Sequence, residues 1–107
     1  MNFLGIHRVK VVDLDLDGDL DIVGGSEQTP YSLSQGLAWW RNDGGYPVTW
    51  TKFVIDFTFK HVMSVDVAYI DPDPFPDIVA SSWSNGKISW WRKKSKKRTN
   101  GEDATPL

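Results

Sequence analysis

The chain has 107 residues, the size of one domain, and it contains no cysteine, which excludes a disulfide framework and thiol chemistry. Its net charge of −2 is unevenly placed: residues 1–91 carry six basic and twelve acidic residues, a balance of −6, whereas the other six basic residues lie within 92–98. An acidic body repels nucleic acid, and the basic segment alone supplies only weak, salt-sensitive affinity for phosphate. No apolar run is long enough to cross a bilayer.

Taken in order, the chain predicts short strands separated by turn-forming residues, with no helical period. The predicted strands lie near residues 9–14, 21–26, 36–42, 50–56, 62–70, 77–83 and 87–92. The turns between the first four strands contain glycine, proline and asparagine, which favour tight reversals. Residues 93–107 offer almost nothing to bury and are predicted to form a basic, disordered tail.

The most unusual stretch is 13–21, where five aspartates recur at two-residue spacing with a glycine after the third. Such a density of negative charge favours a bound cation, and calcium takes six to eight oxygen ligands, which a tight loop can supply from alternate positions. At position 12 of the ladder, where a helix–loop–helix calcium site has a glutamate, this chain has Gly24 within a strand-like segment. The stretch is therefore predicted to be a calcium loop between two strands. The alternative is a solvated acidic turn without an ion.

The chain also contains an internal repeat. The run 9–17 is echoed by 65–73, and the tripeptide 21–23 recurs as 77–79, both at an offset of 56. A Trp-Trp-Arg motif at 39–41 recurs at an offset of 51. Three matches in the same order indicate two copies of one unit.

Four short strands in a repeat of roughly 50 residues are typical of a propeller blade. The predicted fold is all-β, with two propeller-type four-stranded blades at about 1–56 and 57–92, the second incomplete. Closing a propeller takes about four blades or more. We therefore expect either a partial β-propeller or one that homo-oligomerisation completes.

The acidic run, followed by a small-residue strand and by residues 36–42, resembles the FG-GAP/VCBS repeat of integrin α-subunit propellers and many secreted microbial proteins. The resemblance covers residues 9–92 in two copies. It implies a Ca²⁺ ion in the loop between the first two strands of the blade. The implied ligands are Asp13, Asp15, Asp17, Asp21 and the main-chain carbonyl of Asp19. It also implies an extracellular or periplasmic location, although residues 1–8 lack the pattern of a signal peptide.

The second acidic loop departs from this pattern. Tyr69 stands at its first position, Pro74 replaces the turn glycine and Phe75 stands at position 7. The carboxylates that remain form a candidate weak metal loop: Asp71, Asp73 and Asp77. With fewer ligands, this loop is predicted to be metal-poor or empty.

The predicted function is non-catalytic: a calcium-stabilised scaffold or binding module for protein or glycan partners. His7 and His61 stand without a nucleophile context, so no catalytic residue is predicted. One alternative is a lectin-like protein that stacks sugars on exposed Trp40 and Trp91. Because adjacent residues of a strand point to opposite faces, one tryptophan of each pair is instead expected to pack between blades. Another alternative is a non-catalytic fragment of a larger secreted enzyme.

Overall fold

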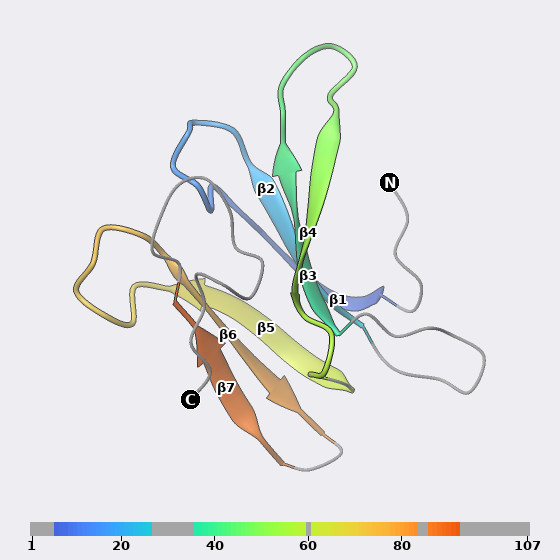
Figure 1. The fold of residues 1–107 in the computed structure, drawn as a ribbon, viewed down its shortest axis with the longest axis vertical. Coiled ribbons are helices and arrows are strands. Elements are labelled where there is room, and N and C mark those ends of the chain that lie inside the picture. The colour runs from blue at the N-terminus through green and yellow to red at the C-terminus, as the bar shows by residue number, and fades with distance from the viewer. Residues whose placement is uncertain (1–5, 27–35, 60, 84–85, 93–107) are drawn as a thin grey trace.

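The computed structural model describes residues 6–26, 36–59, 61–83 and 86–92 (Figure 1). These residues form two antiparallel sheets, one with the strand order β1-β2-β3-β4 and one with the order β5-β6-β7. The strands are β1 (Ile6–Val12), β2 (Asp21–Ser26), β3 (Leu37–Asn42), β4 (Trp50–Asp56), β5 (Val62–Ala68), β6 (Asp77–Ser82) and β7 (Ile88–Trp91). The all-β prediction is confirmed. The predicted tail at 93–107 lies outside the described residues.

The ends of the first strand differ from the prediction. The strand begins at Ile6 and ends at Val12, before the acidic run, because Leu14 turns inward and becomes fully buried. Burial of this leucine draws the start of the acidic loop toward the core. Among the described residues no helix occurs that is long and apolar enough to span a bilayer.

The two sheets repeat the same pairing. In the first, Val23 lies between Lys10 and Trp39; in the second, Val79 lies between Asp66 and Trp90. Both β1 and β5 also carry a register irregularity at their second residue. The sequence repeat is therefore a repeat of strand register as well.

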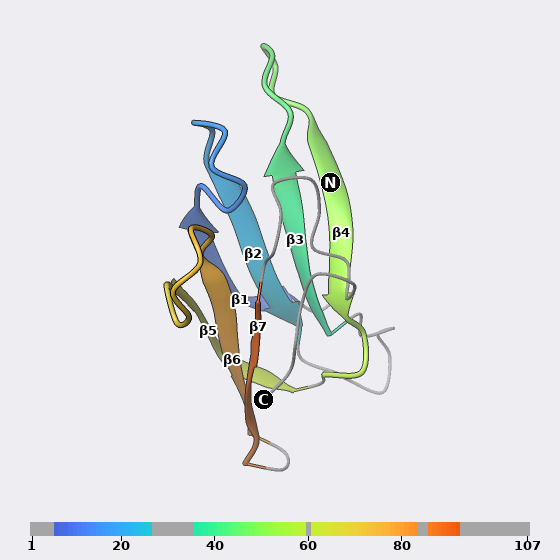
Figure 2. The ribbon, with the colours of Figure 1, turned by 60° about the vertical axis from the view of Figure 1, so that its left-hand side comes forward.

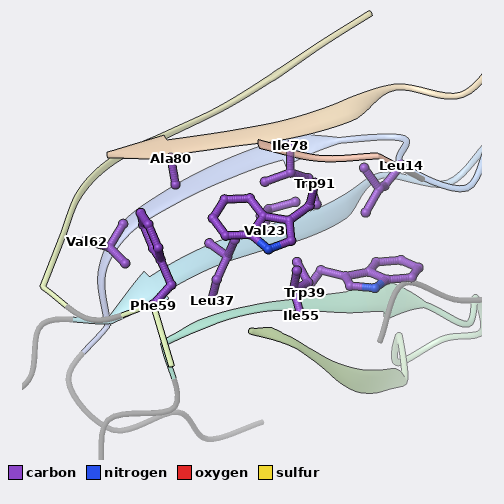
Figure 3. Packing of buried hydrophobic residues seen from close by; sticks show 10 residues of the cluster. All are labelled: Leu14, Val23, Leu37, Trp39, Ile55, Phe59, Val62, Ile78, Ala80 and Trp91. Carbon is purple, nitrogen blue, oxygen red and sulfur yellow. The ribbon is translucent and has the colours of Figure 1, made fainter. Parts of the chain in front are cut away.

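The hydrophobic core lies between the two sheets (Figure 3). Trp39 of the first sheet stacks on Phe53 with ring centroids 5.0 Å apart. Trp91 of the second meets the edge of Phe59 at 4.9 Å. The rest of the fully buried cluster comes from both sheets: Leu14, Val23, Leu37, Ile55, Val62, Ile78 and Ala80. Neither sheet could bury these side chains alone, so they must fold together.

The sheets approach each other most closely along their first strands, β1 and β5 (Figure 2). The Arg8 side chain donates from Nε to the Met63 carbonyl at 2.7 Å, and Lys10 Nζ lies 3.2 Å from an Asp66 carboxylate oxygen. Each acidic loop joins the first and second strands of its sheet, so the two loops occupy equivalent places in the two sheets.

Candidate metal centre

The β1–β2 loop brings four of the five predicted aspartates together. One carboxylate oxygen from each of Asp13, Asp15, Asp17 and Asp21 lies within 4.8 Å of the others. Calcium binds oxygen at about 2.3–2.6 Å, so two ligands on opposite sides of the ion are about 5 Å apart. The spacing of the four carboxylates fits that sphere.

Backbone amides hold three of these carboxylates in place, those of Asp13, Asp17 and Asp21. Asp13 accepts hydrogen bonds from the amides of Asp17 and Gly18, at 3.1 and 2.9 Å. Asp21 accepts one from Leu14 at 2.9 Å and one from Asn42 at 2.8 Å. Asp21 therefore ties the start of the loop to the end of β3, with its side chain fully buried.

Asp15 is also buried, at 4 % exposed, but in contrast to Asp13 and Asp21 it has a carboxylate oxygen, Oδ1, with no hydrogen-bond partner among the described residues. A buried carboxylate oxygen without a partner costs free energy, and the cost grows when the group is ionised. A cation at the centre of the cluster would supply the missing interaction.

The protonation of these carboxylates also depends on their burial and on how close they lie to one another. Burial, the largest cause, and the negative charges of Asp21, Asp17 and Asp13 together raise the pKa of Asp15 to about 7. Burial also raises the pKa of Asp21, whereas hydrogen bonds from the amides of Asn42, Leu14 and Asp15 lower it. In the metal-free protein the cluster therefore resists full ionisation, and a divalent cation would relieve that resistance.

The loop that presents these groups is sharply turned. Leu16 has a φ of 60° and Gly18 a φ of 97°, both in the left-handed region. This conformation is costly for a residue with a side chain, and the buried Leu14 and Asp21 on either side hold the loop in it. Asp19 donates its amide to Asp17 Oδ1 at 2.9 Å, and its own carboxylate lies outside the cluster. The prediction that its carbonyl binds the ion stays a prediction.

Asn42 is a supporting residue to which sequence reasoning gave no role. Its amide donates to Asp21, and its side-chain Nδ2 donates to the Leu20 carbonyl at 3.1 Å. In the sequence, Asn42 is marked only by its position directly after the Trp-Trp-Arg motif. That position does not indicate its hydrogen-bond partner Asp21, which lies 21 residues earlier in the chain.

The second loop brings Asp71, Asp73 and Asp77 together in the same way, with one oxygen from each within 4.8 Å of the others. Two differences set it apart from the first loop. It brings together three carboxylates in place of four, although backbone amides donate to them as in the first loop: Ile70 and Asp71 donate to Asp77, and Phe75 donates to Asp73. In addition, Arg92 Nε lies 3.6 Å from Asp71 Oδ2, so a guanidinium already supplies positive charge.

Burial raises the pKa of Asp73, and its amide bond from Phe75 lowers it. The arrangement favours the prediction that this loop is metal-poor. It does not test it directly.

The tryptophans proposed as sugar platforms do not lie on the surface. Trp40 is 4 % exposed and Trp91 is 2 % exposed, so neither ring offers a face to a pyranose. Their burial supports the packing role that the sequence also allowed. The exposed tryptophan is Trp83, at 52 %, which meets His61 edge-on with ring centroids 4.7 Å apart.

No catalytic residue was predicted, and the described groups form no nucleophile–base pair. His61 has a φ of 56°, and its buried Nδ1 has no hydrogen-bond partner among the described residues. Within the described residues its ring meets that of Trp83, and no serine hydroxyl bonds to it there. The side chain of His7 lies outside the described set.

Comparison with protein-family models, with curated proteins and with solved structures found no match to this chain. The function is therefore argued from the residues and the geometry of the site.

Proposed function

We propose that the chain is a non-catalytic β-propeller module, stabilised by one calcium ion in the β1–β2 loop, that serves as a scaffold for binding partners. The observation that carries the proposal is the buried, unpartnered Oδ1 of Asp15 within a group of four convergent carboxylates. The repeat register and the resemblance of the acidic loop to FG-GAP/VCBS repeats support the propeller part.

The donor set favours calcium over other metals. All four side-chain ligands are carboxylates, which suit hard cations, and no histidine or cysteine of the described residues joins them. Magnesium demands nearly ideal octahedral geometry and gives up its water reluctantly. A loop that supplies several closely spaced carboxylates better matches the larger and more adaptable coordination of calcium.

The ion would act as a structural clamp. Bound at the loop, it would neutralise the carboxylates of Asp13, Asp15, Asp17 and Asp21, which otherwise repel one another. Because Asp21 also accepts from Asn42, the clamp would connect β1, β2 and β3 at one end of the sheet. Extracellular placement and glycan binding remain expectations from the resemblance, and the buried Trp40 and Trp91 give the lectin alternative no support.

Thermal melting in chelator, in calcium and in magnesium tests the metal. A ligand at one hundred times its dissociation constant stabilises by about 2.7 kcal/mol. In a domain of this size that corresponds to a rise in melting temperature of roughly 10 °C or more. Calcium should produce this rise and magnesium a much smaller one.

The matched variants are Asp15→Asn, which removes the buried ligand, and Asp43→Asn, which removes an exposed carboxylate paired with Arg41 outside the loop. Asp15→Asn should abolish the calcium-induced shift, and Asp43→Asn should keep it. A melting temperature that does not respond to calcium in the unmodified chain would refute the metal site.

A further inference from the structure

The two sheets meet through unlike faces. Trp39 and Trp91 both lie in the shared core, yet they are not repeat equivalents (Figure 3). Trp39 and Trp90 pair with the equivalent residues Val23 and Val79, whereas Trp40 and Trp91 pair with Ile22 and Ile78. We call the face that carries Trp39 or Trp90 the leading face of its sheet, and the face that carries Trp40 or Trp91 the trailing face. The contact within the chain is leading face on trailing face.

The trailing face of the second sheet is covered by this contact. In the first sheet the β1 part of the trailing face is exposed, although Ala38 and Trp40 of β3 on the same face are buried. Val62 is fully buried, and Val65 and Val67 are partly buried against the core. Their equivalents at the offset of 56 are exposed apolar residues of β1. They are Ile6 at 38 %, Val9 at 57 % and Val11 at 55 %.

The leading faces show the reverse pattern. Leu14 and Leu37 of the first sheet are fully buried by the contact. Their equivalents in the second sheet, Ile70 and Ile88, are 46 % and 63 % exposed. Val79 and Trp90 are likewise only half-buried, although Val23 and Trp39 are fully buried. The chain thus exposes, along β1 and on the leading face of the second sheet, apolar residues that are equivalent to residues buried in its internal interface.

From this pattern we propose that the chain associates head-to-tail with a second copy of itself, the leading face of β5–β7 packing on the trailing face of β1–β4. A second copy is the occupant because the exposed apolar residues are the repeat equivalents of residues that already pack against one another inside the chain. The proposal rests on the propeller part of the proposed function and not on the calcium ion.

The charges on the first strands of the two sheets, β1 and β5, also favour a second copy of the chain as the partner. Lys10 and Asp66 are repeat equivalents, and within the chain they form an ion pair at 3.2 Å while both remain about half exposed or more. In a head-to-tail stack, each Asp66 would also face Lys10 of the next copy. Opposite charges would then alternate from one first strand to the next, which favours this register over a like-on-like contact.

One residue difference between the two repeats affects the packing at the proposed interface. Val62 lies over Gly25, but the equivalent of Gly25 is Ser81, whose hydroxyl bonds the Ser64 hydroxyl at 2.7 Å. Ile6 of the second copy therefore has to sit further from the sheet than Val62 does. The contact between copies should be weaker than the contact within the chain, and association should depend on concentration.

Head-to-tail contacts are heterologous, so they produce closed rings or open filaments, and the smallest ring is two chains joined through both faces. The test begins with sedimentation equilibrium of the 107-residue chain over a range of concentrations, with calcium and with chelator. The expected result is reversible growth to several multiples of the 12.1 kDa monomer. A monomer at every concentration would overturn the proposal, whereas an assembly that stops at two chains would be the smallest closed ring.

Two single substitutions then separate the faces. Val11→Lys places a charge on the trailing face of the first sheet, and Ile88→Lys places one on the leading face of the second. Each alone should reduce the protein to monomer at concentrations where the unmodified chain is assembled. The exposed turn residue Phe57 provides the control, since Phe57→Lys adds the same charge outside both faces and should leave assembly intact.

Mixing the two variants is the decisive step, because each retains the face that the other has lost. A head-to-tail interface predicts a one-to-one complex that grows no further. If the mixture stays monomeric while both variants keep the circular dichroism of the unmodified chain, the arrangement is wrong. Should either variant lose that spectrum, Val9→Lys and Ile70→Lys test the same two faces. An absent calcium shift with retained assembly would refute only the metal site, and the opposite result would refute only this interface.

Discussion

Val62 lies directly over Gly25, so close that a Cβ atom on this glycine would stand 2.3 Å from Val62 Cγ1 and 2.7 Å from Val62 Cβ. The first residue of the second sheet thus rests on bare backbone of the first. This contact accounts for a glycine in the middle of β2, where a side chain would otherwise favour the strand. It also identifies the position at which the two sheets have least room to adjust.

Gly25→Ala should therefore destabilise the protein by about 1–3 kcal/mol, the usual cost of overpacking a core. The matched variant is Gly24→Ala, whose new methyl group would meet Ile6 Cδ1 at 2.8 Å and Trp40 Cζ3 at 3.0 Å. Since Ile6 can move its flexible end, this second substitution should cost less. Urea denaturation measures both, and equal losses would show that the contact with Val62 is not the tight point.

Trp91→Ala should cost about 3–5 kcal/mol, because it empties the centre of the core beside Phe59. Trp83→Ala, on the exposed side of the same sheet, should cost less than about 1 kcal/mol. The difference between the two losses of stability distinguishes a tryptophan that packs in the core from one that lies on the surface. A stable, fully folded Trp91→Ala protein would contradict its assignment to the core.

Asp21→Asn should destabilise the chain even in chelator. Both carboxylate oxygens of Asp21 accept backbone amides, and an asparagine can present only one oxygen to those two donors. One buried amide would lose its partner, at a cost of about 1–3 kcal/mol. Melting of the chelated variant measures this cost. If the Asp21→Asn variant in chelator melts at the same temperature as the unmodified chain, the hydrogen bonds to Asp21 do not stabilise the loop.

The metal-free protein should lose stability as the pH rises from about 4 to 7. Burial holds the pKa of Asp15 at about 7 in the folded state, above its ordinary value of 3.8. Between these values the folded chain keeps a proton that the unfolded chain has released, so the free energy of unfolding falls with pH, by at most about 1.4 kcal/mol per unit, and levels off above 7.

Denaturant titrations in chelator at several pH values test this slope. Asp15→Asn removes the titrating group and should flatten it, while Asp43→Asn serves as the control. If the unmodified chain in chelator becomes more stable over the same pH range, the change in its free energy of unfolding has the opposite sign to that expected, and the raised pKa of Asp15 is wrong.

Calorimetric titration should give one tight calcium ion per chain. The second loop holds Asp71 beside Arg92 and brings together three carboxylates in place of four, so it offers less to a cation. Asp73→Asn should leave the tight site unchanged, whereas Asp15→Asn should remove it. Two ions bound with equal affinity would show that the guanidinium does not weaken the second loop.

The strands and the acidic loops could be predicted from the sequence because their signals are local. Alternating apolar residues and turn-forming residues act within a few positions, and the seven strands lie where those patterns predict. The end of β1 was missed because it depends on the burial of Leu14 against residues far along the chain. For the same reason the pairing of Asn42 with Asp21 was not visible.

By itself, then, the sequence determined the repeat, the all-β class and the carboxylates that face a common loop, since all three follow from spacing along the chain. Tertiary structure decided that both tryptophans of the first pair are buried but only Trp91 of the second. It also left Asp15 Oδ1 without a partner and placed Arg92 beside Asp71. These outcomes depend on which sheet face meets which. Burial and desolvation arise from residues brought together across the whole chain, and no local pattern contains them.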